Sequence, residues 1–164
     1  MKTKKLNFCS GNDIKESWDN ADIQKNEKIF FCDANKFPYP FQTNTYEYIL
    51  IKQTLHMLIS PEKVLKELRR ICKPQGVIEI EVPHYTNKGA NTDILTKHYF
   101  SEATFHELIN QSASMKKLNE FKIQEIKLNP TIIGKIFPKP LRNKLSLFIN
   151  GLISTINIKL IVIK

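Results

Sequence analysis

Two histidines and a carboxylate lie in one stretch of the sequence and could move a proton together. His84 and His98 flank Asp93. An imidazole exchanges protons near neutral pH, and a neighbouring carboxylate can fix its orientation, as general acid–base catalysis requires. We predict His84 and His98 as candidate catalytic bases and Asp93 as the orienting carboxylate, with Tyr85 and Tyr99 lining the substrate pocket. Alternatively, His84 only hydrogen-bonds the loop backbone, and His98 only supports the start of a helix.

The cysteines offer weaker chemistry. Cys9, Cys32 and Cys72 are scattered, odd in number and lack C-x-x-C spacing. This pattern argues against a disulfide framework or a zinc ribbon and fits a reducing compartment. No partner base for a nucleophilic Cys9 is identifiable. A site built from His84, His98 and a cysteine lacks the short ligand spacing of zinc proteins, so we expect no metal.

A turn of small residues follows the first apolar segment and could approach a ligand. The strand expected over 4–8 leads into Cys9, Ser10 and Gly11. Small residues after a buried strand let backbone N–H groups reach a nucleotide-like ligand. A single glycine in that place is more often only a turn, so the motif alone does not establish a site.

Apolar periodicity predicts the elements that position these residues. The clearest helix spans 61–72, with Ser60 as its N-cap and Pro61 at its first position. Its exit turn at 73–76 leads to a strand at 77–82, which completes a strand–helix–strand unit. A second helix begins at Ser101, and an amphipathic helix is expected over 141–153. The remaining expected strands are 18–23, 28–32, 46–51, 121–128 and 156–163.

The connections between the first three strands are unusually short. Residues 9–17 separate the first two strands, whereas a parallel crossover normally needs a dozen or more residues and a helix. Glu79 and Glu81 alternate with apolar residues in the strand at 77–82. Both observations predict that one face of the sheet is thinly covered, and an exposed apolar face there would favour a homodimer.

The order of these motifs resembles that of class I S-adenosylmethionine-dependent methyltransferases of the small type 11 kind, over essentially the whole chain. Leu6–Gly11 resembles the family's L-N-L-G-C-G opening, and 32–41 resembles its D-L-x-x-L-P-F segment. The stretch 46–49 resembles F-D-x-I. The later matches are 55–68 to V-L-E-H-L-x-x-P-x-x-x-L-x-E-L, 72–76 to L-K-P-G-G, and the segments around His84 and His98 to V-P-H-Y and H-F-F-S.

The resemblance implies an α/β fold and a cofactor. The fold is a Rossmann-like, doubly wound, mostly parallel seven-stranded sheet with a reversed final hairpin, here with reduced helices between the first three strands. The cofactor is S-adenosylmethionine, with Asp22 against its ribose hydroxyls and Asp33 beside its adenine. The implied cofactor-binding residues lie at the ends of the first four strands: Phe8, Cys9, Ser10, Gly11, Asp22, Ile23, Asp33, Ala34 and Gln53.

Three motifs depart from the family pattern. Cys9 replaces the first loop glycine, His56-Met57 replaces the family's E-H pair, and Gln75 replaces a glycine of the helix-exit turn. The Cys9 side chain stands where the methionine part of the cofactor would lie. It either narrows the pocket, weakens binding or is accommodated.

The activity expected from the resemblance is methyl transfer to an oxygen or nitrogen nucleophile of a small-molecule, glycan or lipid-linked acceptor. The sulfonium donor is already activated, so the protein mainly positions the reactants and removes a proton. One alternative is a non-catalytic methyltransferase-like domain that binds a partner. Another is a nucleic-acid methyltransferase, although Lys52-Gln53-Thr54 stand where an N-P-P-Y-type motif would follow the fourth strand.

The composition is that of one basic globular domain over residues 1–164. The net charge of +9 permits contact with nucleic acid or an anionic membrane surface, but only 135–144 forms a local basic cluster, and the excess of lysine can equally be compositional. No apolar signal segment follows Met1–Lys5, and the uncharged stretch 145–158 is too short and polar to span a bilayer. We therefore expect a cytoplasmic protein without a transmembrane segment.

Overall fold

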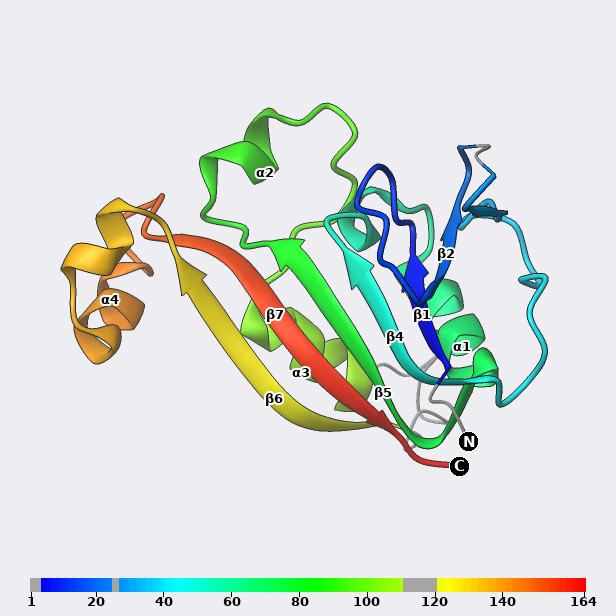
Figure 1. Ribbon diagram of the computed structural model, residues 1–164. Coiled ribbons are helices and arrows are strands. Elements are labelled where there is room, and N and C mark those ends of the chain that lie inside the picture. Colours follow the sequence, from blue (N-terminus) through cyan, green and yellow to red (C-terminus); the bar gives the residue numbers. More distant parts are fainter. Residues whose placement is uncertain (1–3, 25–26, 111–120) are drawn as a thin grey trace.

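A seven-stranded sheet forms the centre of the molecule (Figure 1). The computed structural model describes residues 4–24, 27–110 and 121–164. The strand order is β3-β2-β1-β4-β5-β7-β6, with β1 to β5 parallel and β7 antiparallel to both of its neighbours. The strands are β1 (Lys5–Phe8), β2 (Asp19–Asp22), β3 (Phe30–Phe31), β4 (Tyr46–Lys52), β5 (Cys72–Pro83), β6 (Phe121–Pro130) and β7 (Ile153–Val162).

The predicted Rossmann-like sheet with a reversed final hairpin is confirmed. From β1 the chain builds outward through β2 and β3, and then returns to place β4 on the other side of β1. This reversal creates the crevice at the carboxyl ends of β1 and β4 where ligands of such folds bind. The described residues between β1, β2, β3 and β4 contain no helix, as the short connections predicted. The helices are α1 (Pro61–Ile71), α2 (Lys88–Thr92), α3 (Glu102–Asn110) and α4 (Lys139–Leu145), with 3-10 turns η1 (Leu55–Met57) and η2 (Ile133–Ile136).

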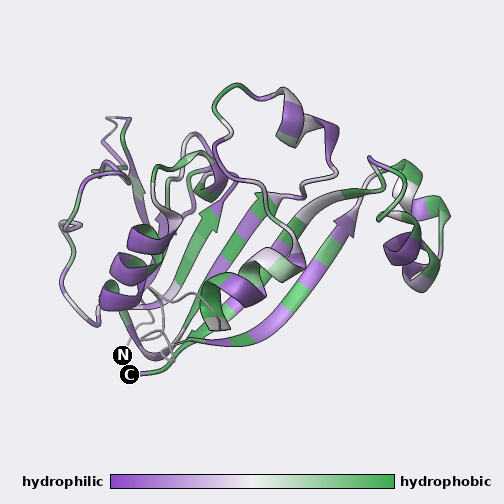
Figure 2. Ribbon diagram, turned by 180° about the vertical axis from the view of Figure 1, so that it is seen from behind, coloured by the Kyte–Doolittle hydropathy of each residue, from purple (hydrophilic) through white to green (hydrophobic). Residues whose placement is uncertain are grey.

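Helices α1 and α3 cover the same face of the sheet (Figures 1 and 2). The hydroxyl of Ser60 caps α1 by accepting from the Lys63 backbone N–H at 3.5 Å, and Pro61 begins the helix. The apolar stripe of α1 is fully buried, as are the alternate residues of β5 that face it. These residues are Val64, Leu65, Leu68 and Ile71 on α1, and Ile78, Ile80 and Val82 on β5.

The other face of the sheet carries no helix among the described residues, and several of its side chains are polar (Figure 1). Glu79 on β5 accepts hydrogen bonds from the Tyr48 hydroxyl and, at 2.7 Å, from the Asn157 amide. Lys159 on β7 pairs with Glu125 on β6 at 3.7 Å. Cross-strand pairs of this kind stabilise polar side chains on a sheet face that is exposed to water. The thin cover that the sequence predicted for this face is present, polar pairs occupy part of it, and the homodimer stays a prediction.

Several boundaries differ from the sequence expectation: the strand expected over 28–32 is reduced to Phe30–Phe31, and two other differences change the local structure. The helix expected over 141–153 ends at Leu145, because the apolar residues 147–149 find no core to pack on. Gly151 then turns the chain at a φ of 83° into β7. The exit turn at 73–76 forms a bulge within β5, since Tyr46 pairs with Cys72 and Tyr48 pairs with Val77.

No helix in the described part of the chain has the length and apolar character needed to cross a membrane. Within the same residues, no cluster of three or more His, Cys, Asp or Glu side chains could hold a metal ion.

Candidate functional site

A cavity of about 240 Å³ lies at the carboxyl ends of β1, β2, β3 and β4, at the point where the strand order reverses. We call it the switch-point cavity. It brings together six of the nine residues that the resemblance implied for the cofactor: Cys9, Gly11, Asp22, Ile23, Asp33 and Ala34. The sequence analysis missed its other lining residues, which are Cys32, Asn35, Thr54, Met57 and Leu58.

The other three implied residues lie around the cavity rather than on its wall. Phe8 is buried in the core and packs against Tyr39, with ring centroids 4.8 Å apart. Ser10 is buried, and its hydroxyl has no hydrogen-bond partner among the described residues. The side-chain amide of Gln53 donates to Glu81 at 3.0 Å.

Two buried asparagines hold the loop after β1 in the place of a helix. The Asn7 amide donates to the Asp13 carbonyl at 2.6 Å and to the Asn20 side-chain oxygen at 3.1 Å. Asn20 in turn accepts from the Lys15 backbone N–H and donates to the Lys15 carbonyl, both at 3.0 Å. These amides supply the backbone partners that a helix would otherwise provide. The sequence analysis did not select Asn7 or Asn20; the signal that could have found them is a polar residue at a position expected to be buried in a strand.

Asp22 is the polar centre of the cavity. Its carboxylate accepts from the Gly11 backbone N–H at 2.9 Å and from the Gln24 backbone N–H at 3.0 Å, one bond on each oxygen. Gly11 has a φ of 49°, a conformation that glycine adopts without strain. Each carboxylate oxygen keeps a further lone pair, so Asp22 can still accept from the hydroxyls of a ligand.

Asp33 fixes the opposite wall. Its carboxylate accepts from the Asn35 backbone N–H at 2.9 Å, and the Asn35 side chain accepts from the Ile59 backbone N–H at 2.9 Å. The solvent-exposed Lys36 pairs with Asp33 at 3.5 Å. The lining residues include two carboxylates and no cation, in a chain of net charge +9, and Lys36, which lies outside the lining, offsets part of the charge of Asp33 but not that of Asp22. Such a wall disfavours an anionic ligand and favours a neutral or cationic one.

The two cysteines of the cavity remain thiols. Burial, together with the nearby Asp22 carboxylate, strongly raises the pKa of Cys9, and burial raises the pKa of Cys32 to about 12. A thiolate is the reactive form of cysteine, so neither residue is a nucleophile near neutral pH. Cys9 lies in the left-handed region at a φ of 57°, where the family pattern has a glycine.

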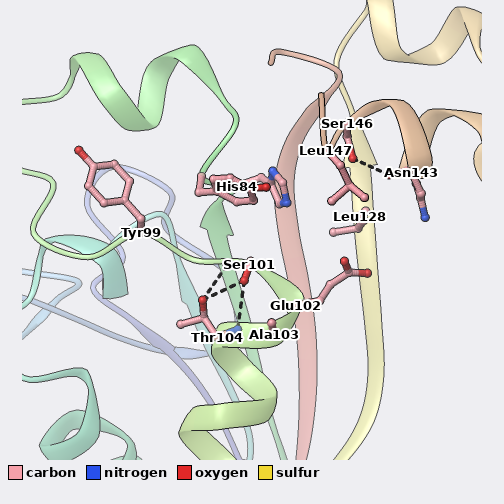
Figure 3. Close-up of a pocket in the computed structure, with 11 residues that line it drawn as sticks. His84, Tyr99, Ser101, Glu102, Ala103, Thr104, Leu128, Asn143, Ser146 and Leu147 are labelled. Atoms are coloured by element: carbon pink, nitrogen blue, oxygen red, sulfur yellow. Dashed lines mark hydrogen bonds between the residues drawn. The ribbon is translucent and has the colours of Figure 1, made fainter. Parts of the chain in front are cut away.

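A second cavity of about 390 Å³ lies beyond the end of β5 (Figure 3). We call it the acceptor cavity. The expected substrate-site residues His84, Tyr85 and Tyr99 line it, because the Tyr85 backbone N–H donates to the Phe100 carbonyl at 2.9 Å and so joins the two segments. The other lining residues are Ser101, Glu102, Ala103, Thr104, Leu128, Asn143, Ser146 and Leu147.

The hydrogen bonds of His84 define its tautomer. The ring is buried, which lowers its pKa and keeps it neutral at pH 7. The Thr86 backbone N–H donates to Nδ1 at 3.3 Å, and the Thr86 hydroxyl lies 2.7 Å from the same atom. A backbone N–H can only donate, so Nδ1 is an acceptor and Nε2 carries the ring proton. His84 thus presents a donor rather than a free base at Nε2.

The other two expected catalytic residues lie apart from His84. His98 lines a neighbouring cavity of about 580 Å³, and its Nε2 is buried with no partner among the described residues. Asp93 is exposed, and its carboxylate accepts from the Leu95 backbone N–H at 2.9 Å. Thr86, rather than Asp93, therefore orients His84. Glu102 supplies the one carboxylate among the lining residues of the acceptor cavity.

The comparisons with known proteins agree with this geometry. A family model described as a methyltransferase domain, of type 11, matches residues 4–80. No curated protein matched the chain by sequence.

Solved structures share the fold at low sequence identity. The YcgJ protein from Bacillus subtilis is 14% identical with a TM-score of 0.66, over 99% of this chain and 93% of that one. An S-adenosylmethionine-dependent methyltransferase from Mesorhizobium loti is 10% identical with a TM-score of 0.64, over 96% and 90%. The [4+2]-cyclase SpnF is 10% identical with a TM-score of 0.63, over 97% and 74%. At these identities the likeness shows the fold alone.

Proposed function

We propose that this chain is an S-adenosylmethionine-dependent methyltransferase, because the methyltransferase type 11 model matches residues 4–80, and that it transfers a methyl group to an oxygen or nitrogen of a small-molecule, glycan or lipid-linked acceptor. The observation that carries this proposal is the switch-point cavity, with two carboxylates and no cation among its lining residues. S-adenosylmethionine carries a sulfonium cation, which such a wall favours.

The loop after β1 also distinguishes this cofactor from a dinucleotide. A pyrophosphate is normally bound by the N-terminus of the helix that follows the first strand. The described residues between β1 and β2 form no helix, and Asp22 already engages the Gly11 backbone N–H. An anionic phosphate would meet Asp22 with no helix N-terminus to offset the repulsion. A cofactor without phosphate meets no such penalty.

The residues present fit the adenosine part of the cofactor. Asp22 retains lone pairs for the ribose hydroxyls, and apolar side chains of Ile23, Ala34, Met57 and Leu58 can pack on the adenine. When bound, the cofactor supplies a methyl group already activated on sulfur.

The acceptor cavity supplies complementary roles. We assign the Nε2–H of His84 to donate to an oxygen of the acceptor, which holds the nucleophile in place. The Glu102 carboxylate receives the proton that a hydroxyl or amine releases as it is methylated. Tyr85 and Tyr99 provide aromatic walls of the kind that sugars and other amphipathic acceptors contact.

Calorimetric titration with S-adenosylhomocysteine, the demethylated product, tests the cofactor site. We expect binding by the full chain, and at least about tenfold weaker binding by Asp22→Asn, since loss of a hydrogen bond to a charged group costs about 1.5–3 kcal/mol. Asp13→Asn is the matched control, because it removes an exposed carboxylate from the same loop. Circular dichroism checks that both variants are folded.

Three outcomes separate the interpretations. Binding that only Asp22→Asn weakens supports the site. Binding that neither variant changes would place the cofactor elsewhere in the molecule. No binding by the parent chain at millimolar ligand would refute the transferase proposal and leave a non-catalytic domain of the same fold.

A further inference from the structure

The segment between β6 and β7 projects beyond the edge of the sheet (Figure 1). Its residues 131–151 contain η2 and α4 and are called the lobe here, and the buried Leu152 joins them to β7. Its base is fixed, because the Thr131 hydroxyl donates to the Gly151 carbonyl at 2.6 Å. The Gly151 backbone N–H in turn donates to the Thr86 carbonyl at 2.9 Å, which joins the lobe to the loop that orients His84.

Large apolar side chains of the lobe are exposed to an unusual degree. Ile132 is 87% exposed, Ile136 is 76% exposed and Phe148 is 86% exposed. The other exposed apolar residues of the lobe are Ile133, Leu141, Leu147 and Ile149. Single exposed apolar residues are normal on a protein surface, but a concentration of them in one short segment marks an interaction site.

The lobe is also uniformly cationic. Lys135, Lys139 and Lys144 are exposed, and no carboxylate among the described residues pairs with them. The sequence contains no Asp or Glu at all from residue 126 to residue 164. Lysines interleaved with Ile, Leu and Phe are the composition of segments that lie in the interface of an anionic membrane.

We propose that the lobe binds the surface of an anionic phospholipid bilayer. Its apolar side chains enter the boundary between headgroups and acyl chains, and its lysines contact the headgroup phosphates. A second copy of this chain is a poorer occupant, because it would bring an equally cationic lobe against this one. A nucleic acid would satisfy the lysines but would leave Ile132, Ile136 and Phe148 in water.

The acceptor cavity opens beside this lobe. Asn143, Ser146 and Leu147 belong to the lobe and also line that cavity (Figure 3). Docking of the lobe would therefore place the mouth of the cavity at the bilayer surface, where a lipid-linked acceptor is presented. This consequence rests on the proposed methyl transfer, whereas the binding of the lobe to lipid does not.

Vesicle co-sedimentation of the full chain tests the proposal. The probes are vesicles of phosphatidylcholine with about 30% phosphatidylserine, and vesicles of phosphatidylcholine alone, at about 50 mM salt. We expect binding to the anionic vesicles only. Each surface lysine contributes about fivefold to such binding, so the triple variant Lys135→Gln, Lys139→Gln and Lys144→Gln should weaken it about 100-fold. The matched control removes three exposed lysines outside the lobe: Lys63→Gln, Lys88→Gln and Lys122→Gln.

A second variant isolates the apolar part of the proposal. Ile136→Ser with Phe148→Ser retains every charge and should abolish the binding that persists at high salt, where electrostatic attraction is screened. Neither side chain contributes to the core, so the fold should survive. No binding to anionic vesicles, or an equal loss in the lobe and control lysine variants, would overturn the proposal. So would a dimer, seen by sedimentation velocity, that the lobe variants dissociate, since it would assign the lobe to a second copy.

Discussion

Replacement of Cys9 by glycine should strengthen cofactor binding with little change in stability. An L-residue in the left-handed region costs about 1–2 kcal/mol, and Cys9 has a φ of 57°. Glycine avoids this strain, but its greater freedom in the unfolded chain costs about 0.5–1 kcal/mol. Loss of the half-buried thiol costs a similar amount. These terms nearly cancel, so Tm should change by no more than about 4 °C.

The Cys9→Gly replacement should raise the affinity for the cofactor because it enlarges the switch-point cavity. At about 240 Å³, the switch-point cavity is smaller than the range of about 300–1,000 Å³ typical of ligand sites. Cys9 lies in the loop where the methionine end of the cofactor is expected. Removing its side chain should tighten S-adenosylhomocysteine binding about tenfold, equivalent to about 1.4 kcal/mol. Cys9→Ala, which removes the sulfur but keeps the backbone strain, should give most of the same gain.

Calorimetric titration of the parent chain and these variants measures the effect. Ser17→Gly is the matched control, because Ser17 also has a positive φ, of 64°, but is exposed and does not line the cavity. It should alter stability without altering affinity. An unchanged affinity in Cys9→Gly would refute the reasoning that this side chain limits the site. An equal gain in Ser17→Gly would attribute the effect to loop freedom instead.

Three further predictions follow from buried polar groups. Burial lowers the pKa of both His56 and His84, so below about pH 6.5 the unfolded chain binds protons that the folded chain does not. The free energy of unfolding should lose up to about 2.7 kcal/mol per pH unit from these residues as the pH falls below 6.5, and urea titrations of the His56→Gln, His84→Gln variant should lack this component. Asn20→Leu should lower the free energy of unfolding by about 2–4 kcal/mol and abolish cofactor binding. Asn12→Ala, on the exposed part of the same loop, should do neither. Urea unfolding measures the stability of each variant, and calorimetric titration measures its cofactor binding. In a methyl-transfer assay, His84→Gln should retain more activity than His84→Ala, because glutamine keeps a side-chain N–H donor; equal losses would favour a base at this position.

The sequence predicted α1 and β5 because a helix or strand with one buried face has apolar residues at regular spacing. The stripe of α1 and the alternation in β5 each follow from one face meeting the core, and both were visible as apolar spacing. The short connections likewise predicted the missing helices. Glu79 already indicated a partly open face, but its partners Asn157 and Lys159 on β7 were not predicted, because they meet it only once the strands are in register.

In the candidate site, too, some features could be predicted from the sequence and others could not. Asp22 and Asp33 could be placed because motif order fixes where strands end, and both line one cavity. The hydrogen bonds that hold the site in place could not be predicted, because they join residues whose spacing in the sequence follows no helix or strand period. Asn7 meets Asn20 across two strands, and Thr86 takes the role expected of Asp93 through a bond within its own loop. Orientation of a side chain depends on such local hydrogen bonds, which residue type alone does not specify.

The lobe is where the sequence expectation failed most, and the failure has a physical meaning. The sequence predicted an amphipathic helix over 141–153, but α4 ends at Leu145, and Leu147 and Phe148 are exposed. An apolar residue indicates that a position gains from leaving water; it does not indicate whether the chain's own core or another apolar phase receives it. Exposed apolar side chains also occur elsewhere in the described chain, such as Phe30 and Phe31 of β3, each 54% exposed. In the lobe, the lysines and the absence of any Asp or Glu after Glu125 indicate that the apolar phase it enters has an anionic surface. We therefore assign the lobe to a bilayer surface and not to a misplaced part of the core.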